Sequence, residues 1–366
     1  MTKGTLRQGA SRSRRPRHGG PIKPARVEER TRVVELVEQF KSTSFQSRNI
    51  YKAYDVLKRM QTDPARPTIF LGLAGAMVPA GMKGALMDMI KHKMVDVIVS
   101  TGANLTHDLV EALGALHLVG TPETDDLELR KRGYCRIYDT YLDERGFYAE
   151  EDLVLSVLSQ MKAREYSSRE FFEDLGRRLS PRNSLVALAA RKGVPIYCPA
   201  LCDSDIGIAL TLHHAKNLER PAPSINPIRD NFEIYQIYRR SNRTGAILIG
   251  GGVPRNYIQQ LSVICEALRV DRADRNSQMG HDYGVLITTD SPQWGGLSGC
   301  TFSESISWGK YSVGSRTATV YADATIVLPI LVGALIQKLA GKLASKPRLE
   351  LMWDGAKLRR IARRTD

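Results

Sequence analysis

The sequence is poor in cysteine and has no closely spaced set of metal-ligating residues. Its five cysteines among 366 residues are few and odd in number, which favours a reducing compartment and no disulfide framework. Cys198 and Cys202 are not at a tight zinc spacing, and His213 and His214 have no ligand-spaced partner nearby. We therefore expect no metal site.

Long apolar runs are also absent. The longest, near residues 324–336, has about 13 residues and contains Pro329, whereas crossing a bilayer takes roughly 20. The sequence has no secretory hydrophobic segment. The N-terminal segment is acid-free through Val27 and rich in Arg and Ser, like a mitochondrial transit peptide, but Gly19, Gly20, Pro21 and Pro24 argue against an amphipathic helix. We expect a cytoplasmic protein with no membrane partner.

Acidic residues are scarce at the two ends of the chain. The chain has 53 Lys plus Arg against 39 Asp plus Glu, a formal net charge of +14. Residues 1–30 hold nine basic and two acidic residues, and residues 337–366 hold nine and three, so the rest is nearly neutral. A basic end can contact nucleic acid, but a solvated tail is the simpler interpretation.

The middle of the chain alternates between short apolar runs and amphipathic helical stretches. The runs are rich in β-branched residues, which is typical of strands buried on both faces. They lie at 68–74, 95–100, 194–197, 246–249, 284–288 and 319–321, and a run at 185–190 is interpreted as a helix. Helical periodicity is found between them, as at 82–93, 108–116 and 256–268. The pattern predicts an α/β fold: a mostly parallel sheet with helices on both faces, in a single large domain.

The composition divides the chain into three parts. We interpret residues 1–30 as a disordered basic tail and residues 31–344 as the folded domain. Residues 345–366 are interpreted as a second basic tail, in which 355–364 is a candidate short helix. Residues 121–180 are more charged and aromatic than their surroundings, which indicates an insertion or helical subregion rather than a second domain.

Small residues follow most of the predicted strands. In an open parallel sheet, ligands bind beyond the carboxyl ends of the strands, where small residues allow the backbone to approach a cofactor. These ends are 74–81, 100–104, 199–205, 250–254 and 288–290. None of them is a strict G-x-G-x-x-G fingerprint, and glycines at strand ends also serve tight turns. The pattern favours a nucleotide cofactor.

The segment from Trp294 to Lys310 contains the most suggestive arrangement. It places Lys310 two residues after Trp308, close to glycines and to the carboxylate of Glu304. A lysine desolvated against an apolar surface has a lowered pKa and can attack an imine or carbonyl carbon as a free amine. The alternative is a surface lysine beside a core tryptophan, and the pattern alone favours that alternative.

Several ordered motifs resemble one known family. They include MVDVIVSTG at 94–102, LIGGGV at 248–253, SWGK at 307–310 and VYADA at 320–324, together with 70–72, 80–81, 108–109, 199–203 and 282–283. Together they resemble deoxyhypusine synthase, and most closely its bacterial deoxyhypusine synthase-like branch, which is related to homospermidine synthases. The resemblance spans residues 40–340.

The resemblance implies a Rossmann-like fold and a homotetramer with active sites at dimer interfaces. It also implies a tightly bound NAD, with which the family oxidises spermidine before a lysine captures the aminobutyl group as an imine. Lys310 stands at the position of that lysine, Trp308 beside the amine tunnel and Glu304 at an amine-holding carboxylate. The positions that correspond to NAD contacts are Gly75, Ala76, Met77, Val78, Pro79, Thr101, Gly102, Ala103, Asp203, Gly251, Thr289, Asp323 and Ala324.

The chain departs from the family pattern at the amine site. Asn256 replaces the catalytic histidine, and asparagine cannot act as a base near pH 7. His107 replaces a glutamate and is our candidate for proton transfer. Ile208 and Leu297 replace two amine-binding aspartates, and Asp205 is a candidate to compensate for the first.

Three functions are open from these residues. The first is an NAD-dependent transferase that moves an aminobutyl-type group to a small amine such as putrescine, giving homospermidine. The second is true deoxyhypusine synthesis on a translation-factor lysine, made less favourable by the missing histidine. The third is a non-catalytic NAD-binding scaffold whose basic tails contact RNA.

Overall fold

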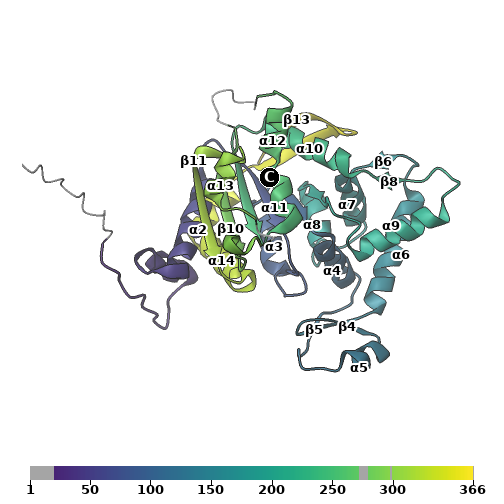
Figure 1. Ribbon diagram of the computed structural model, residues 1–366, viewed down its shortest axis with the longest axis horizontal. Helices are drawn as coiled ribbons and strands as arrows, with labels where there is room; N and C mark the ends of the chain where they lie inside the picture. Colours follow the sequence, from purple (N-terminus) through teal and green to yellow (C-terminus); the bar gives the residue numbers. More distant parts are fainter. Residues whose placement is uncertain (1–19, 272–278, 297–298, 366) are drawn as a thin grey trace, which may run out of the picture.

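A computed structural model describes residues 20–271, 279–296 and 299–365 (Figure 1). Its centre is a six-stranded sheet, in which every pair of neighbouring strands is parallel. The strands lie in the order β11 (Tyr311–Tyr321), β10 (His281–Thr288), β9 (Thr244–Ile249), β1 (Thr68–Leu73), β2 (Val97–Ser100) and β7 (Ile196–Tyr197). The predicted α/β fold with a parallel sheet is therefore confirmed.

Side-chain alternation along the strands divides the core into two layers. In β1, Ile69, Leu71 and Leu73 pack on one face, and Phe70 packs on the other. The first face is covered by α1 (Val33–Gln39), α2 (Phe45–Thr62), α3 (Lys83–Lys91), α4 (Gly102–Ala112), α6 (Arg145–Gln160), α7 (Ser168–Arg177), α8 (Leu185–Lys192), α9 (Asp205–Lys216) and α14 (Ala324–Ala344). The second is covered by α10 (Pro227–Arg240), α11 (Gly252–Gln259), α12 (Leu261–Ala267) and α13 (Phe302–Ser307).

The remaining elements are small. Strand β3 (Leu118–Val119) directly precedes the segment 121–180 that the sequence marks as an insertion, and α5 (Asp126–Lys131), β4 (Tyr134–Ile137) and β5 (Thr140–Asp143) lie within it; the three strands form an antiparallel sheet. Strands β6 (Glu165–Tyr166) and β8 (Ser224–Ile225) pair in parallel, and η1 (Phe40–Ser42) and η2 (Pro292–Trp294) are short 3₁₀ turns.

The C-terminal region is an antiparallel hairpin, so the prediction of a basic tail with a helix at 355–364 is wrong. Strands β12 (Arg348–Asp354) and β13 (Lys357–Arg364) pair along their length, and Leu349 and Leu358 are buried in the second layer. Alternation sends Leu349, Leu351 and Trp353 to one side, while Glu350 and Met352 between them face solvent. The apolar residues at every second position explain the hairpin.

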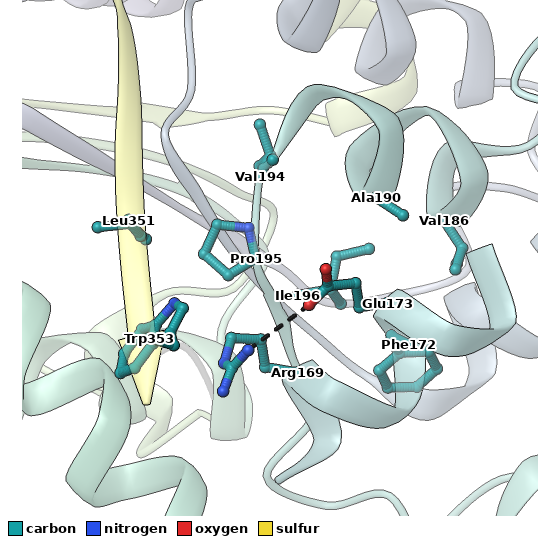
Figure 2. A pocket seen from close by; sticks show the side chains of 11 residues that line it. Arg169, Phe172, Glu173, Val186, Ala190, Val194, Pro195, Ile196, Leu351 and Trp353 are labelled. Carbon is teal, nitrogen blue, oxygen red and sulfur yellow. Dashed lines mark ion pairs between the residues drawn. The ribbon is translucent and has the colours of Figure 1, made fainter. Parts of the chain in front are cut away.

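The hairpin also closes a cavity of about 100 Å³ against α7, α8 and β7 (Figure 2). Trp353 lies over the guanidinium of Arg169, 4.4 Å from the ring centre. Arg169 in turn forms a buried ion pair with Glu233 of α10, with Nε 2.7 Å from the carboxylate. In Figure 1 the yellow hairpin lies beside α10, which it contacts. The hairpin is therefore part of the folded domain.

The N-terminal segment was expected to be a basic tail. Residues 1–19 of the predicted N-terminal tail lie outside the described residues. Residues 20–32 have no helix or strand, and Lys23 and Arg26 hydrogen-bond through their backbones to Ser42 and Gln39.

Helix α14 has 21 residues with Pro329 inside it, so by length and composition it could cross a membrane, although 324–336 was expected to be too short. It packs against α1, α2 and α3 in the first layer.

Candidate active site

A cavity of about 320 Å³ lies at the carboxyl edge of the sheet, where the strand order changes direction. The chain builds β1, β2 and β7 to one side, then returns to place β9, β10 and β11 on the other. Such a switch point leaves a crevice between neighbouring loops, the usual ligand position in this topology. The cavity is lined by Ala74, Gly75, Ser100, Thr101, Gly102, Ala200, Asp203, Gly250, Gly251, Gly252, Val253 and Pro254.

The glycines are required by the close packing of these loops. A Cβ atom on Gly102 would lie 2.5 Å from the Cβ of Ser204, a distance that side chains do not adopt. Gly250 and Gly252 have φ values of +72° and +60°, in the left-handed region that favours glycine. Helices α4 and α11 both begin at this cavity, at Gly102 and Gly252, and present free backbone N–H groups there. This arrangement suits a ligand with phosphate groups.

Five of the predicted cofactor residues line the cavity, and eight do not. The five are Gly75, Thr101, Gly102, Asp203 and Gly251. Of the others, Ala76, Met77, Val78 and Pro79 continue the loop after β1, Ala103 is exposed in the first turn of α4, and Thr289, Asp323 and Ala324 follow β10 and β11 along the same sheet edge.

Asn104 organises the loop after β1, a role that the sequence did not reveal. The side chain is fully buried in α4. Its Nδ2 donates to the carbonyl of Gly75 at 2.6 Å, and its Oδ1 accepts from the backbone of Val78 at 3.2 Å. A polar residue within a helical pattern gives no signal of this kind, because its partners are 26 and 29 residues away in sequence.

Lys310 lies next to the helix that leaves the cavity. Pro254 of α11 lines the cavity, and two residues later Oδ1 of Asn256 accepts a hydrogen bond of 2.9 Å from Nζ of Lys310. The ammonium is 5.7 Å from the ring centre of Trp308, which is 65% exposed. Lys310 precedes β11 and is half-buried, after Gly309 at φ +66°. The structure thus brings Lys310, Trp308 and Asn256 together, within one helical turn of the cavity wall.

Glu304 and Arg255 form hydrogen bonds to Thr301 and Cys300 in the chain segment that precedes Trp308. Glu304 closes the first turn of α13, where Thr301 donates to it from its backbone and hydroxyl at 2.7 Å, and these bonds lower the pKa of the carboxyl. Arg255 is 3% exposed and donates to the carbonyl of Cys300. Its Nε and Nη1 have no hydrogen-bond partner among the residues described. Its position beside Asn256 was not singled out from the sequence.

The remaining predicted residues lie on the other face of the sheet. His107 is buried in α4 and hydrogen-bonded to His117, and Asp205 begins α9, where burial raises the pKa of its carboxyl. Helix α4 belongs to the first layer, whereas α11, which carries Asn256, belongs to the second. Within one chain the structure therefore does not bring His107 to Lys310. Ile208 is 54% exposed, and Leu297 lies outside the described residues.

In the described part of the chain, no group of three His, Cys, Asp or Glu side chains could hold a metal ion. The described cysteines are all free thiols. The reactive groups near the cavity edge are therefore the Lys310 amine, the Asn256 amide and the Glu304 carboxylate, together with any ligand that the cavity binds.

Comparison with known proteins agrees with this geometry. The model of the deoxyhypusine synthase family matches residues 35–335. The chain belongs to the deoxyhypusine synthase family. It is 42% identical to "Probable deoxyhypusine synthase 2" of Methanosarcina acetivorans, over 92% of this chain and 94% of that protein. It is 38% identical to the "Deoxyhypusine synthase-like protein" of Chlorobaculum tepidum, over 84% of this chain and 87% of that protein.

A solved structure supports the fold of this family member. The crystal structure of a "putative deoxyhypusine synthase" from Entamoeba histolytica superposes with a TM-score of 0.55 and 20% identity, over 82% of this chain and 91% of that one. The family transfers aminobutyl groups, so the chain is assigned to this class of transferase. Three of the motifs that carried the resemblance, at 94–102, 199–203 and 248–253, contribute residues to the switch-point cavity, and the motif at 307–310 contains Lys310.

Proposed function

We propose that this protein is an NAD-dependent transferase that moves an aminobutyl-type group between amines through an imine on Lys310. The acceptor we propose is a small amine such as putrescine, which would give homospermidine. The observation that carries this proposal is the 2.9 Å hydrogen bond between Lys310 and Asn256, one turn from the cavity.

The cavity fits NAD. Gly102 and Ser204 leave no room for a side chain between them, and the helix N-termini at Gly102 and Gly252 offer N–H groups to a pyrophosphate. Gly75, Thr101, Gly102, Asp203 and Gly251 are the residues that would hold it. When bound, NAD supplies the acceptor and later the donor of a hydride.

Lys310 makes the transfer covalent. As a free amine, Nζ adds to the oxidised carbon of the donor and expels the rest of the donor as an amine, which leaves an imine on Lys310. The acceptor amine then adds to the same carbon and releases Lys310. One hydride leaves at the start and returns at the end, so the two electrons balance. Asn256 orients the lysine by accepting its N–H, and it cannot remove a proton.

The departures from the family pattern favour a small acceptor. Asn256 stands where the family has a histidine, and the exposed Ile208 stands where it has an aspartate. These changes leave the nucleophile and the cavity in place and alter only the amine site. The competing candidate is deoxyhypusine synthesis on a protein lysine, which the names of the archaeal relatives support.

We also propose that the active unit is a homotetramer in the cytoplasm, with active sites at dimer interfaces. The support is the placement of the predicted residues on two faces of the sheet. His107 and Lys310 contribute to one site if each comes from a different subunit.

The test is incubation of the protein with NAD, spermidine and putrescine, followed by mass spectrometry of the amines. We expect homospermidine from the wild type and none from Lys310→Ala. Lys162→Ala, which removes an exposed lysine far from the cavity lining, is the matched control and should retain activity. Cyanoborohydride should trap a mass increase on the peptide that contains Lys310.

Two results would redirect the proposal. A mass increase on one lysine of a supplied translation-factor precursor, with no new polyamine, would establish the protein acceptor instead. Absence of every amine product, with Lys310→Ala indistinguishable from the wild type, would exclude both transferase functions.

A further inference from the structure

A chain of hydrogen bonds leads from His107 into the protein. Nδ1 of His107 lies 3.0 Å from Nε2 of His117, and Nδ1 of His117 lies 2.6 Å from Oε1 of Glu111. Lys83 forms an ion pair with the other carboxylate oxygen of Glu111. The side chains of Lys83, Glu111 and His117 are only 11%, 18% and 6% exposed, so water competes little for these bonds.

The Glu111 carboxylate determines which ring nitrogen of each histidine carries a proton. Burial would raise the pKa of Glu111, but the hydrogen bonds from His117 and Lys83 outweigh it and hold the pKa below its usual value. The carboxylate can only accept, so His117 donates from Nδ1 and, when neutral, accepts at Nε2. His107 then donates from Nδ1, which leaves its Nε2 with a free lone pair.

His107 is uncharged at neutral pH. Burial lowers its pKa to about 4, with a further contribution from His117, against the opposing charge of Glu111. The ring of Phe147 from α6 packs edge-on against the imidazole, with ring centres 5.8 Å apart. The neutral imidazole is the form in which Nε2 can accept a proton.

The hydrogen-bonded residues His107 and Glu111 lie on a side of α4 that leads to the cavity. Ala103, His107 and Glu111 follow one another at four-residue spacing, so they share one side of the helix. Gly102 begins the helix and lines the cavity, and Ala103 is exposed beside it. His107 is therefore one turn from this rim, and it retains 9% exposure.

We propose that His107, His117 and Glu111 form a proton relay that deprotonates the substrate amine, replacing the base that Asn256 cannot supply. This proposal rests on the proposed function. An ammonium N–H bond breaks as a proton binds Nε2 of His107. The His107 Nδ1–H bond then breaks as an N–H bond forms at Nε2 of His117. The positive charge ends on His117, beside the Glu111 carboxylate, and no oxidant or reductant is needed.

Other charges near the relay come from the elements packed on α4. Lys83 of α3 pairs with Glu111, so the ammonium and the carboxylate offset each other's charge. On α6 the buried Glu150 is held protonated near neutral pH, because burial raises its pKa to about 8. Asp108 turns to α8, where Ser184 and two backbone N–H groups satisfy it, and Asp205 of α9 faces Glu150.

The decisive variant is His117→Gln, because glutamine can hydrogen-bond to His107 but cannot take its proton. We expect kcat with spermidine and putrescine to fall about 100-fold, with KM changed less than about twofold. The acid limb of the kcat pH profile should also move. His214→Gln, which alters an exposed histidine of α9, is the matched control and should leave the profile unchanged. An unchanged profile in His117→Gln would overturn the relay.

A second measurement does not depend on turnover. Deuterium exchange at the imidazole C2 atom, read by mass spectrometry on the full-length protein, reports the pKa of each histidine. Coupled rings titrate together, so His117→Gln should move the pKa of His107 by about one pH unit or more. Equal titration of His107 in both proteins would refute the relay even if the wild type makes no new amine. If His117→Gln does move the pKa of His107 but the wild type makes no new amine, only the proposed function is refuted.

Discussion

Glu150 offers a sharp test of the interior of this structure. Its side chain is completely buried in α6, and neither carboxylate oxygen has a hydrogen-bond partner within the described residues. Burial, with repulsion from Asp205 and Glu151, raises its pKa to about 8 from the usual value of 4.5. The folded protein therefore keeps Glu150 protonated at pH 7, while the unfolded chain releases the proton.

The sign and size of the effect follow from this difference. Below pH 4.5 both states hold the proton, and Glu150 has no pH-dependent effect on the free energy of unfolding. Between pH 4.5 and 8 the unfolded state alone loses it, so the fold loses about 1.4 kcal/mol per pH unit. At pH 7 the accumulated cost is about 3 kcal/mol, and it levels off above pH 8. Glu150→Gln removes a titrating group and should recover this amount.

The assay is urea unfolding followed by circular dichroism at pH 5, 7 and 8.5. The stability gained by Glu150→Gln relative to wild type should grow from under about 1 kcal/mol at pH 5 to about 3 at pH 7. Asp152→Asn makes the same carboxylate-to-amide change two positions on, at an exposed residue of α6, and should show no such growth. A gain independent of pH would mean that Glu150 is ionised in the fold, against the reasoning above.

Three further outcomes are expected. Glu233→Gln removes the buried counter-charge of Arg169 and leaves only the partly exposed Glu173 at 3.6 Å, so it should cost about 3–5 kcal/mol in urea unfolding; a loss below 1 would contradict the buried pair. Leu358→Ala should cost about 2–5 kcal/mol in the same assay, whereas a detached tail would lose nothing. Gly102→Ala forces its Cβ against Ser204 and should weaken NAD binding by calorimetry at least about tenfold, while Gly84→Ala, with open space around it, should not.

The strands could be predicted from the sequence because each is a short apolar run rich in β-branched residues. The runs at 68–74 and 246–249 became β1 and β9, and neighbouring parallel strands brought their glycine-rich ends to one edge. Burial on both faces leaves a continuous apolar signal that needs no tertiary information. The cavity could therefore be located at this edge before its shape was known.

The hairpin was missed for the opposite reason. Its strands are half-exposed, so charged residues alternate with the apolar residues that pack on α10. Net charge measures the exposed side of such a segment and says nothing of the buried side. Lys357, Arg359, Arg360 and Arg364 lie on the exposed side of the hairpin and account for part of the basic excess near the C-terminus, whereas Arg348 is buried.

By itself, the sequence determined the α/β class, the parallel sheet and the motifs that place this chain in its family, because local pattern and residue identity suffice for each. Only the tertiary structure decided which side chains meet. Asn256 reaches Lys310 across 54 residues, and Asn104 reaches the carbonyl of Gly75 across 29. Such pairings depend on how helices pack on the two faces, and no spacing along the chain encodes that packing.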